Sequence, residues 1–231
     1  MQYQLSRVLA GPFLAAMGRP SVSGLEHIPQ TGAAVLASNH LSIIDSVYLP
    51  LMVPRPVVFP AKAEYFSARG PVGRLWAAYL RSTNQLEINR DGARAAQETL
   101  DAAVEILRAG ELFGFYPEGT RSPDGKLYRG RSGIGYLALN SGAPVIPVAM
   151  LGTRTMMPPG RSYLVPAKIR IKIGQPMTFE DLDGVAPAKA RREVAERVMT
   201  AIRELSGQEY VHMYASDRKA EMAAAAHKPK D

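Results

Sequence analysis

Short apolar runs alternate with longer helix-like segments, and this alternation constrains the fold more than any other feature of the chain. Six apolar runs have the length of strands: 32–38, 56–61, 84–88, 111–116, 144–150 and 168–174. Helices are expected at 42–53, 70–80, 91–109, 132–140 and 187–205. Strands that alternate with helices favour an α/β fold with an open, mostly parallel sheet and helices on both faces.

Two segments show their periodicity most clearly. Segment 91–109 carries an apolar stripe at Ala95, Leu100, Val104 and Leu107. Gly110 follows it and is placed to end a helix. Segment 168–174, with the sequence KIRIKIG, alternates basic and apolar residues instead. That pattern is typical of a half-exposed strand, and we expect it near an edge of the sheet.

Composition limits the classes of function that remain. The chain has 231 residues, 46% of them hydrophobic, which is enough for one large domain with a core. We see no internal repeat and no Gly/Ser linker, so a single domain is the expectation. The chain has no cysteine, which excludes disulfides, thiolate metal sites and a cysteine nucleophile.

Positive charge is concentrated in one part of the chain. Residues 121–175 contain nine basic side chains and one acid, Asp124, so this segment exceeds the whole chain's net charge of +7. Such a concentration predicts an anionic partner, which is a phosphate group, an acidic membrane surface or a nucleic acid.

The two ends of the chain differ from the middle. Residues 1–20 are apolar, but their charge-free part, Val8–Gly18, is interrupted by Gly11 and Pro12 and is too short to span a bilayer. Two interpretations stay open: a helix packed on the domain, or an amphipathic helix lying in a membrane interface. We expect the globular domain at 21–215 and a charged, frayed or flexible tail at 216–231.

Polar residues follow the expected strands at their carboxyl ends. In a parallel sheet these ends meet at one edge, where ligands bind in open α/β folds. We therefore expect five side chains that are distant in sequence to converge there: His40, Arg90, Glu118, Arg121 and Arg154.

The spacing of His40 and Asp45 permits two roles for the carboxylate. Ser42 and Asp45 fit an S-x-x-D capping pattern, by which Asp45 would only help to start a helix. Alternatively, His40 lies in the loop and Asp45 in the first helical turn, where the carboxylate orients the imidazole as a general base. This is the His–Asp half of a catalytic triad, with the hydroxyl supplied by a substrate.

Other motifs are weaker. Gly133, Gly135 and Ala138 match G-x-G-x-x-A, but a basic loop precedes them where a dinucleotide site needs a strand. The remaining histidines lack the spacing of metal ligands, so no metal site is expected.

Four blocks resemble those of the glycerolipid acyltransferases, the 1-acylglycerol-3-phosphate O-acyltransferase family. NHLSIID at 39–45 resembles its N-H-x-x-x-x-D block, and YPEGTRS at 116–122 its F-P-E-G-T-R-S block. EINR at 87–90 and VIPV at 145–148 resemble the two other blocks, in family order. The ending LSGQEYVHMYAS is similar to that of actinobacterial members.

The resemblance implies acyl transfer from acyl-CoA or acyl carrier protein to a hydroxyl of a lysophosphatidic acid-type acceptor, without another cofactor. It implies His40 as the base and Asp45 as its partner. The substrate phosphate would be bound by a set that follows two strands: Arg90, Glu118, Gly119, Thr120 and Arg121. Glycerol 3-phosphate or another lysolipid is an alternative acceptor.

Within that set the members differ in chemistry. Arginine suits phosphate because its guanidinium binds it bidentately. The carboxylate of Glu118 would repel phosphate, so we expect it to hold an arginine or the loop, or to accept a hydrogen bond from a substrate hydroxyl. Gly119 would allow close approach of the backbone, with N–H groups for an anion. The donor's phosphates would lie on other basic residues: Arg129, Arg131, Arg154 or Lys172.

Two rival functions use the same features. A nucleic-acid-binding module would use the basic segment, but no binding motif or set of interleaved aromatics accompanies it, and we expect no nucleic-acid partner. A hydrolase would direct the His–Asp pair at water. We further expect a peripheral or monotopic protein on the cytoplasmic face of the cell membrane.

Overall fold

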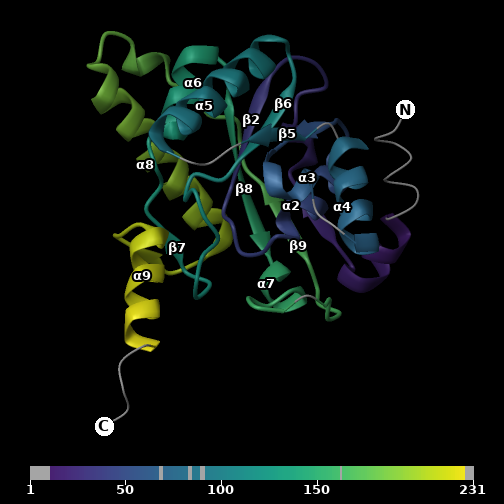
Figure 1. Cartoon of the computed structure of the whole chain (residues 1–231). Coiled ribbons are helices and arrows are strands. Elements are labelled where there is room, and N and C mark those ends of the chain that lie inside the picture. Colours follow the sequence, from purple (N-terminus) through teal and green to yellow (C-terminus); the bar gives the residue numbers. More distant parts are fainter. Residues whose placement is uncertain (1–10, 68–69, 83–84, 89–91, 162, 227–231) are drawn as a thin grey trace.

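The computed structural model describes residues 11–67, 70–82, 85–88, 92–161 and 163–226. Its centre is a six-stranded sheet in the order β1-β9-β8-β2-β6-β3 (Figure 1). The strands are β1 (Ser21–Ser23), β9 (Arg170–Ile173), β8 (Val145–Leu151), β2 (Ala34–Ser38), β6 (Leu112–Phe115) and β3 (Val57–Val58). All neighbours pair in parallel except β8 and β9, which confirms the mostly parallel sheet.

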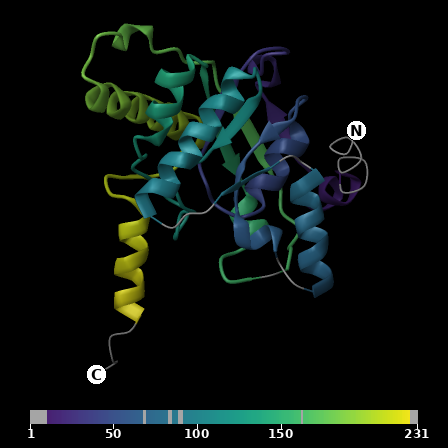
Figure 2. The ribbon, with the colours of Figure 1, turned by 45° about the horizontal axis from the view of Figure 1, so that its top comes forward.

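Alternation along the central strand β2 divides the core into two layers. Val35 and Ala37 point to one face, against α5 (Gly92–Arg108), α6 (Gly133–Ser141) and α8 (Pro187–Ser206). Ala34 and Leu36 point to the other face, against α2 (Asp45–Met52). Because successive side chains of a strand alternate, a strand that is apolar throughout needs cover on both sides. Helices therefore cover both faces, as expected (Figures 1 and 2).

One expected strand lies outside the central sheet. Segment 84–88 forms β5 (Leu86–Ile88), which pairs only with β4 (Pro60–Lys62) among the described strands. Run 56–61 is divided between β3 and β4, because the chain leaves the central sheet at Phe59. The prediction that the ends of all these strands meet at one edge of one sheet was therefore wrong for β5. A second two-stranded sheet pairs β7 (Leu127–Tyr128) with β10 (Tyr210–Val211).

Run 168–174 forms β9, and its residues alternate between exposed and buried. It is the second strand from the edge, covered outside by β1. The predicted half-exposed strand near an edge is confirmed.

The helix expected at 42–53 begins later, at Asp45, since the N–H groups of Leu41 and Ser42 bind the Asp45 side chain and form the preceding turn. The remaining helical segments are η1 (Leu25–His27), α3 (Ala63–Phe66), α4 (Gly70–Ser82), α7 (Thr153–Met156), η2 (Glu180–Leu182) and α9 (Ala215–Ala226). Helix α9 occupies most of the segment for which we expected a frayed or flexible tail.

Residues 11–18 are helical and combine features of both N-terminal interpretations. Leu14 is buried in the core, and its carbonyl oxygen accepts a 2.6 Å hydrogen bond from the hydroxyl of Tyr48. The side chain of Phe13 on the same helix is 60% exposed. Among the described residues, no helix combines the length and the apolar character that crossing a membrane requires.

Candidate active site

His40 and Asp45 form a direct side-chain pair at the carboxyl end of β2. Nδ1 of His40 lies 2.9 Å from Oδ2 of Asp45. Asp45 is fully buried, whereas the His40 side chain is 16% exposed. The arrangement is the predicted one, with the imidazole in the loop and the carboxylate in the first turn of α2.

Asp45 also binds the backbone of the turn that carries His40. Its Oδ2 accepts hydrogen bonds from the N–H groups of Leu41 (2.7 Å) and Ser42 (2.8 Å). The Ser42 hydroxyl donates elsewhere, to the carbonyl oxygen of Met157. The contacts that both predicted roles require are therefore present, because one oxygen of Asp45 binds the turn before α2 and also contacts the imidazole.

A stack of rings supports the imidazole. The Tyr116 ring lies parallel to that of His40, with centroids 3.8 Å apart, and Phe59 packs at 5.4 Å from Tyr116. The Tyr116 hydroxyl and the Ser46 hydroxyl are 2.8 Å apart. Gly114 lies against the Phe59 ring, where a Cβ would collide with it. Sequence reasoning missed this support, although a glycine inside a buried strand is a signal of close approach.

Asn39 anchors the end of β2 to its neighbour. Its side-chain amide donates to the carbonyl oxygen of Met150 and to the side chain of Gln208, and its Oδ1 accepts from the Met150 N–H. These bonds fix the backbone next to His40. Gln208, which lies far away in sequence, was not among the predicted site residues.

Glu118 is buried next to His40 and accepts hydrogen bonds from the protein backbone. It is only 1% exposed, and its two oxygens accept hydrogen bonds from the backbone N–H groups of His40 (3.1 Å) and Tyr128 (3.0 Å). Burial raises the pKa of Glu118 to about 8, although these two hydrogen bonds act in the opposite direction. Glu118 holds the loop, as one interpretation expected. Its inclusion among phosphate-binding residues was wrong, because the carboxylate is buried against backbone.

Gly119 differs from its predicted role. It has a positive φ of 73°, and its N–H donates to the carbonyl oxygen of Tyr116, which closes a turn. That N–H group is therefore engaged within the protein instead of serving an anion. The turn requires a glycine here, because residues with a side chain rarely adopt a positive φ.

Thr120 and Arg121 follow this turn and line a cavity of about 290 Å³ together with His40. A second cavity of about 510 Å³ is lined by His40, Thr120 and Arg131, and by apolar side chains that include Ile88 and Leu100. The structure thus brings three predicted residues, His40, Thr120 and Arg121, to one cavity. Arg90 lies outside the described residues, although the end of β5 reaches the larger cavity through Ile88.

The other predicted basic residues are distributed more widely. Arg154 donates to the carbonyl oxygens of Ser122 (3.3 Å) and Pro123 (2.9 Å), so it holds the loop after Arg121. Lys172 donates to the carbonyl oxygen of Leu205. Both side chains therefore bind backbone oxygens of the protein, although we expected them to bind an anion.

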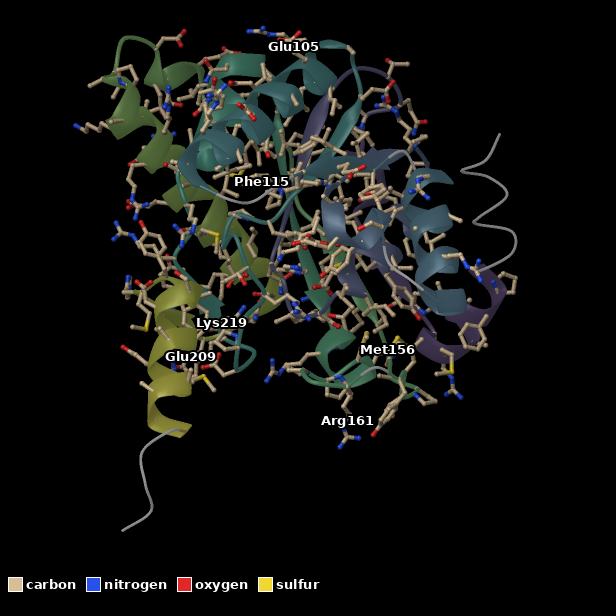
Figure 3. All side chains as sticks on the ribbon, viewed as in Figure 1. Glu105, Phe115, Met156, Arg161, Glu209 and Lys219 are labelled. Atoms are coloured by element: carbon tan, nitrogen blue, oxygen red, sulfur yellow. The ribbon has the colours of Figure 1, made fainter. Side chains whose placement is uncertain are left out.

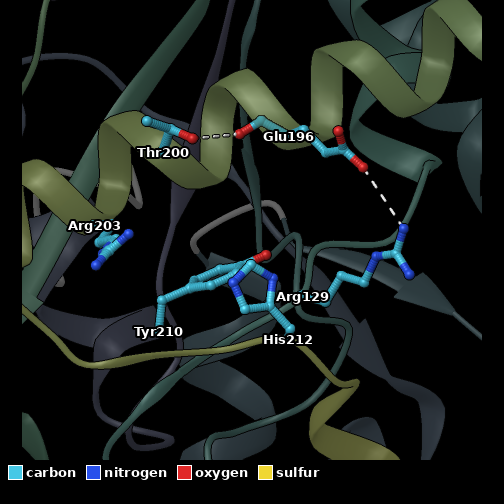
Figure 4. Close-up of a pocket in the computed structure, with 6 residues that line it drawn as sticks. All are labelled: Arg129, Glu196, Thr200, Arg203, Tyr210 and His212. Carbon is cyan, nitrogen blue, oxygen red and sulfur yellow. Dashed lines mark hydrogen bonds and ion pairs between the residues drawn. The ribbon is translucent and has the colours of Figure 1, made fainter.

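Arg129 lies in a separate pocket of about 400 Å³ between α8 and β10 (Figure 4). This pocket shares no lining residue with the two cavities at His40. Arg129 is 3.6 Å from the carboxylate of Glu196 and lies over the ring of Tyr214.

No cluster of histidine and acidic side chains suited to a metal ion occurs in the part of the chain that the structure describes. The cavity at His40 is lined by the imidazole and by the cationic side chains of Lys62 and Arg121, while the carboxylate of Asp45 is buried behind the imidazole.

A family model described as Acyltransferase matches residues 19–151, which include the His–Asp pair and the loop of Glu118. The chain belongs to this acyltransferase family. The chloroplastic 1-acyl-sn-glycerol-3-phosphate acyltransferase LPAT1 of Arabidopsis thaliana is 31% identical over 178 residues, 76% of this chain and 48% of that protein. The chain therefore spans about half the length of this plant relative.

Bacterial relatives match over more of their length. The 1-acyl-sn-glycerol-3-phosphate acyltransferase of Bacillus subtilis is 24% identical over 195 residues, 83% of this chain and 90% of that protein. The crystal structure of the 1-acyl-sn-glycerophosphate (LPA) acyltransferase PlsC of Thermotoga maritima has a TM-score of 0.67 at 29% identity. The matched region covers 88% of this chain and 79% of the Thermotoga maritima chain. The glycerolipid acyltransferase fold that the motifs implied is confirmed.

Proposed function

We propose that this family member is an O-acyltransferase that transfers a fatty acyl group from a thioester to the free hydroxyl of 1-acylglycerol 3-phosphate. The product is phosphatidic acid. The observation that carries the proposal is the 2.9 Å contact between His40 and the buried carboxylate of Asp45, in a cavity that Arg121 also lines. The names of the plant and bacterial relatives support the choice of acceptor.

The reaction follows from the two nitrogens of the imidazole. Nδ1 faces Asp45, so the base is the other ring nitrogen, Nε2. It takes the proton of the acceptor hydroxyl while that oxygen attacks the thioester carbonyl carbon. The tetrahedral intermediate then expels the thiolate, which receives the proton from the imidazolium. Asp45 stabilises the imidazolium throughout, and no acyl-enzyme is formed.

Arg121 is proposed to bind the acceptor's phosphate. Its side chain is exposed and lines the same cavity as His40, so an acceptor can contact both residues. Guanidinium binds phosphate through paired, charge-assisted hydrogen bonds. Arg121→Lys should therefore raise the KM for the acceptor about 10- to 100-fold, with little change in the KM for the thioester.

The thioester donor is proposed to be acyl-CoA or acyl carrier protein, and the protein is proposed to act at the cytoplasmic face of the membrane. The exposed Phe13 on the N-terminal helix supports an interfacial contact with lipid.

The decisive experiment is a panel of acceptors with product assignment by mass spectrometry: glycerol 3-phosphate, both monoacylglycerol 3-phosphate isomers, other lysolipids and water alone. We expect phosphatidic acid from 1-acylglycerol 3-phosphate. Thioester turnover that is independent of any acceptor would instead identify a hydrolase.

The His40→Ala variant tests the mechanism in the same assay. General base catalysis is typically worth about 10²- to 10⁴-fold, so its turnover should fall by that factor while the circular dichroism spectrum is retained. Turnover of His40→Ala near the wild-type rate would contradict the mechanism.

A further inference from the structure

The first half of helix α9 lies against the loop that follows Glu118, although about a hundred residues separate them in sequence. Nζ of Lys219 donates to Oγ1 of Thr120 at 2.5 Å. Arg131 donates to the hydroxyl of Ser216 at 2.9 Å, and Arg218 lies 3.7 Å from the carboxylate of Asp124. Figures 1 and 2 show the far half of the helix extending away from the domain. In Figure 3, Lys219 lies on the side of α9 that faces the domain.

The start of α9 is fixed by packing that is independent of Lys219. Ala215 is completely buried. The ring of Tyr214, just before the helix, lies beneath the guanidinium groups of Arg131 at 4.9 Å and Arg192 at 5.9 Å. Because Lys219 is one turn beyond Ala215, this packing fixes the backbone from which its side chain reaches Thr120.

Lys219 contacts Thr120, the residue that precedes Arg121 in the chain, so the fold brings two cations to the same loop. Lys219 is partly buried, and its pKa is lowered first by that burial and then by the positive charge of Arg121, while Glu118 acts in the opposite direction. Bringing like charges together is unfavourable unless an anion binds between them. A phosphate with two negative charges is the ligand that would relieve this repulsion.

The hydrogen bond to Thr120 also determines what the threonine can offer. A hydroxyl has one proton and two lone pairs, and an ammonium group has three donors. Because Lys219 donates to Thr120, the hydroxyl proton of Thr120 must point away from Nζ, and the lysine has two further N–H groups. Thr120 lines both cavities that contain His40, and Lys219 adjoins the site already described through its hydrogen bond to Thr120.

We propose that Lys219 binds the acceptor's phosphate together with Thr120 and Arg121, so that the C-terminal helix completes the acceptor site. This assignment rests on the proposed function, since it identifies the third residue that contacts the phosphate. It places a binding residue 98 positions beyond Arg121, in a segment that the family match at 19–151 does not reach.

The test compares Lys219→Met with Lys219→Arg and Arg218→Met in the full-length chain. Arg218→Met is the matched control, because it removes a cation and the Asp124 contact from the same turn without touching Thr120. KM and kcat are measured for 1-acylglycerol 3-phosphate and for a monoacylglycerol that lacks the phosphate.

We expect Lys219→Met to raise the KM for the phosphorylated acceptor about 10- to 100-fold, with the donor KM within about 2-fold. Lys219→Arg should recover most of the loss. Arg218→Met and the phosphate-free acceptor should show little change. Equal losses for Lys219→Met and Arg218→Met, or losses shared by both acceptors, would overturn the proposal in favour of helix docking alone.

A second measurement separates this proposal from the proposed function. Inorganic phosphate should raise the melting temperature of the wild-type protein more than that of Lys219→Met, because ligand binding stabilises the native state. This readout does not depend on which acceptor the enzyme uses. Equal shifts in the two proteins would overturn the role of Lys219, whereas a wild-type protein that fails to acylate 1-acylglycerol 3-phosphate would overturn the proposed function.

Discussion

Replacing Asp45 with asparagine separates the charge of this side chain from its shape. The amide oxygen can take the place of Oδ2 and accept the same N–H groups, from His40, Leu41 and Ser42. The amide nitrogen then replaces Oδ1, which is buried and has no hydrogen-bond partner among the described residues. The tautomer of His40 and the turn should therefore survive, while the negative charge is lost.

The size of the effect follows from burial. Removing one partner of a buried ion pair costs about 3–5 kcal/mol. The imidazolium formed in the transition state would belong to a side chain that is 16% exposed, so the lower figure applies. About 3 kcal/mol on the barrier corresponds to a loss of roughly 150-fold in kcat. The unfolding free energy should fall by only about 1–3 kcal/mol, the cost of one unsatisfied buried amide.

The assay is acyl transfer to 1-acylglycerol 3-phosphate, with urea unfolding measured on the same samples. Asp45→Ala should be less stable than Asp45→Asn, because it leaves the two backbone N–H groups without their acceptor. Ser42→Ala is the control, since it removes a neighbouring hydroxyl that donates to the carbonyl oxygen of Met157 and leaves the contacts of the Asp45 carboxylate in place. A kcat of Asp45→Asn within about 3-fold of wild type would refute the role of the charge.

Three further predictions concern the surroundings of the site. The raised pKa of Glu118 means that the native state binds more protons than the unfolded state between pH 4.5 and about 8, so stability should fall as pH rises through this range. Urea unfolding from pH 5 to 9 should show this fall relative to Glu118→Gln, and parallel curves would contradict it. Gly114→Ala should cost about 1–3 kcal/mol of unfolding free energy and lower activity, by displacing Phe59 beneath the Tyr116–His40 stack. Phe13→Ser should weaken binding to lipid vesicles about 10- to 100-fold in co-sedimentation at an unchanged melting temperature, and unchanged binding would count against an interfacial helix.

The helices and strands could be predicted where the pattern that marks them lies within the segment itself. Segment 91–109 has a helical stripe, and the structure has α5 at Gly92–Arg108. Strand pairing was less accessible, because the partner of a strand is distant in sequence. Segment 84–88 has the pattern of a strand, but nothing in that pattern shows that it pairs with β4 outside the central sheet.

The same distinction holds within the site. His40 and Asp45 are five residues apart, so their contact follows from a strand, a loop and a helix start. Glu118 binds backbone N–H groups of His40 and Tyr128, and a backbone partner leaves no mark in the sequence. The sequence left holding the loop as one of several roles for Glu118, and its burial and its backbone partners in the structure select that role.

The basic segment 121–175 shows why a count of charges overstates an anion site. Two of its cations pair with acids from beyond the segment: Lys126 with Glu209 at 2.7 Å, and Arg129 with Glu196 at 3.6 Å. Others donate to backbone carbonyl oxygens, as Arg154 does. A local excess of +8 is thus partly balanced by acids on α8 and next to β10. What distinguishes Arg121 from these neighbours is its position on the wall of a cavity with His40, and position is a property of the fold. We therefore assign phosphate binding by position, to Arg121 on this wall and to Lys219, which the fold brings from α9 to Thr120 on the same wall.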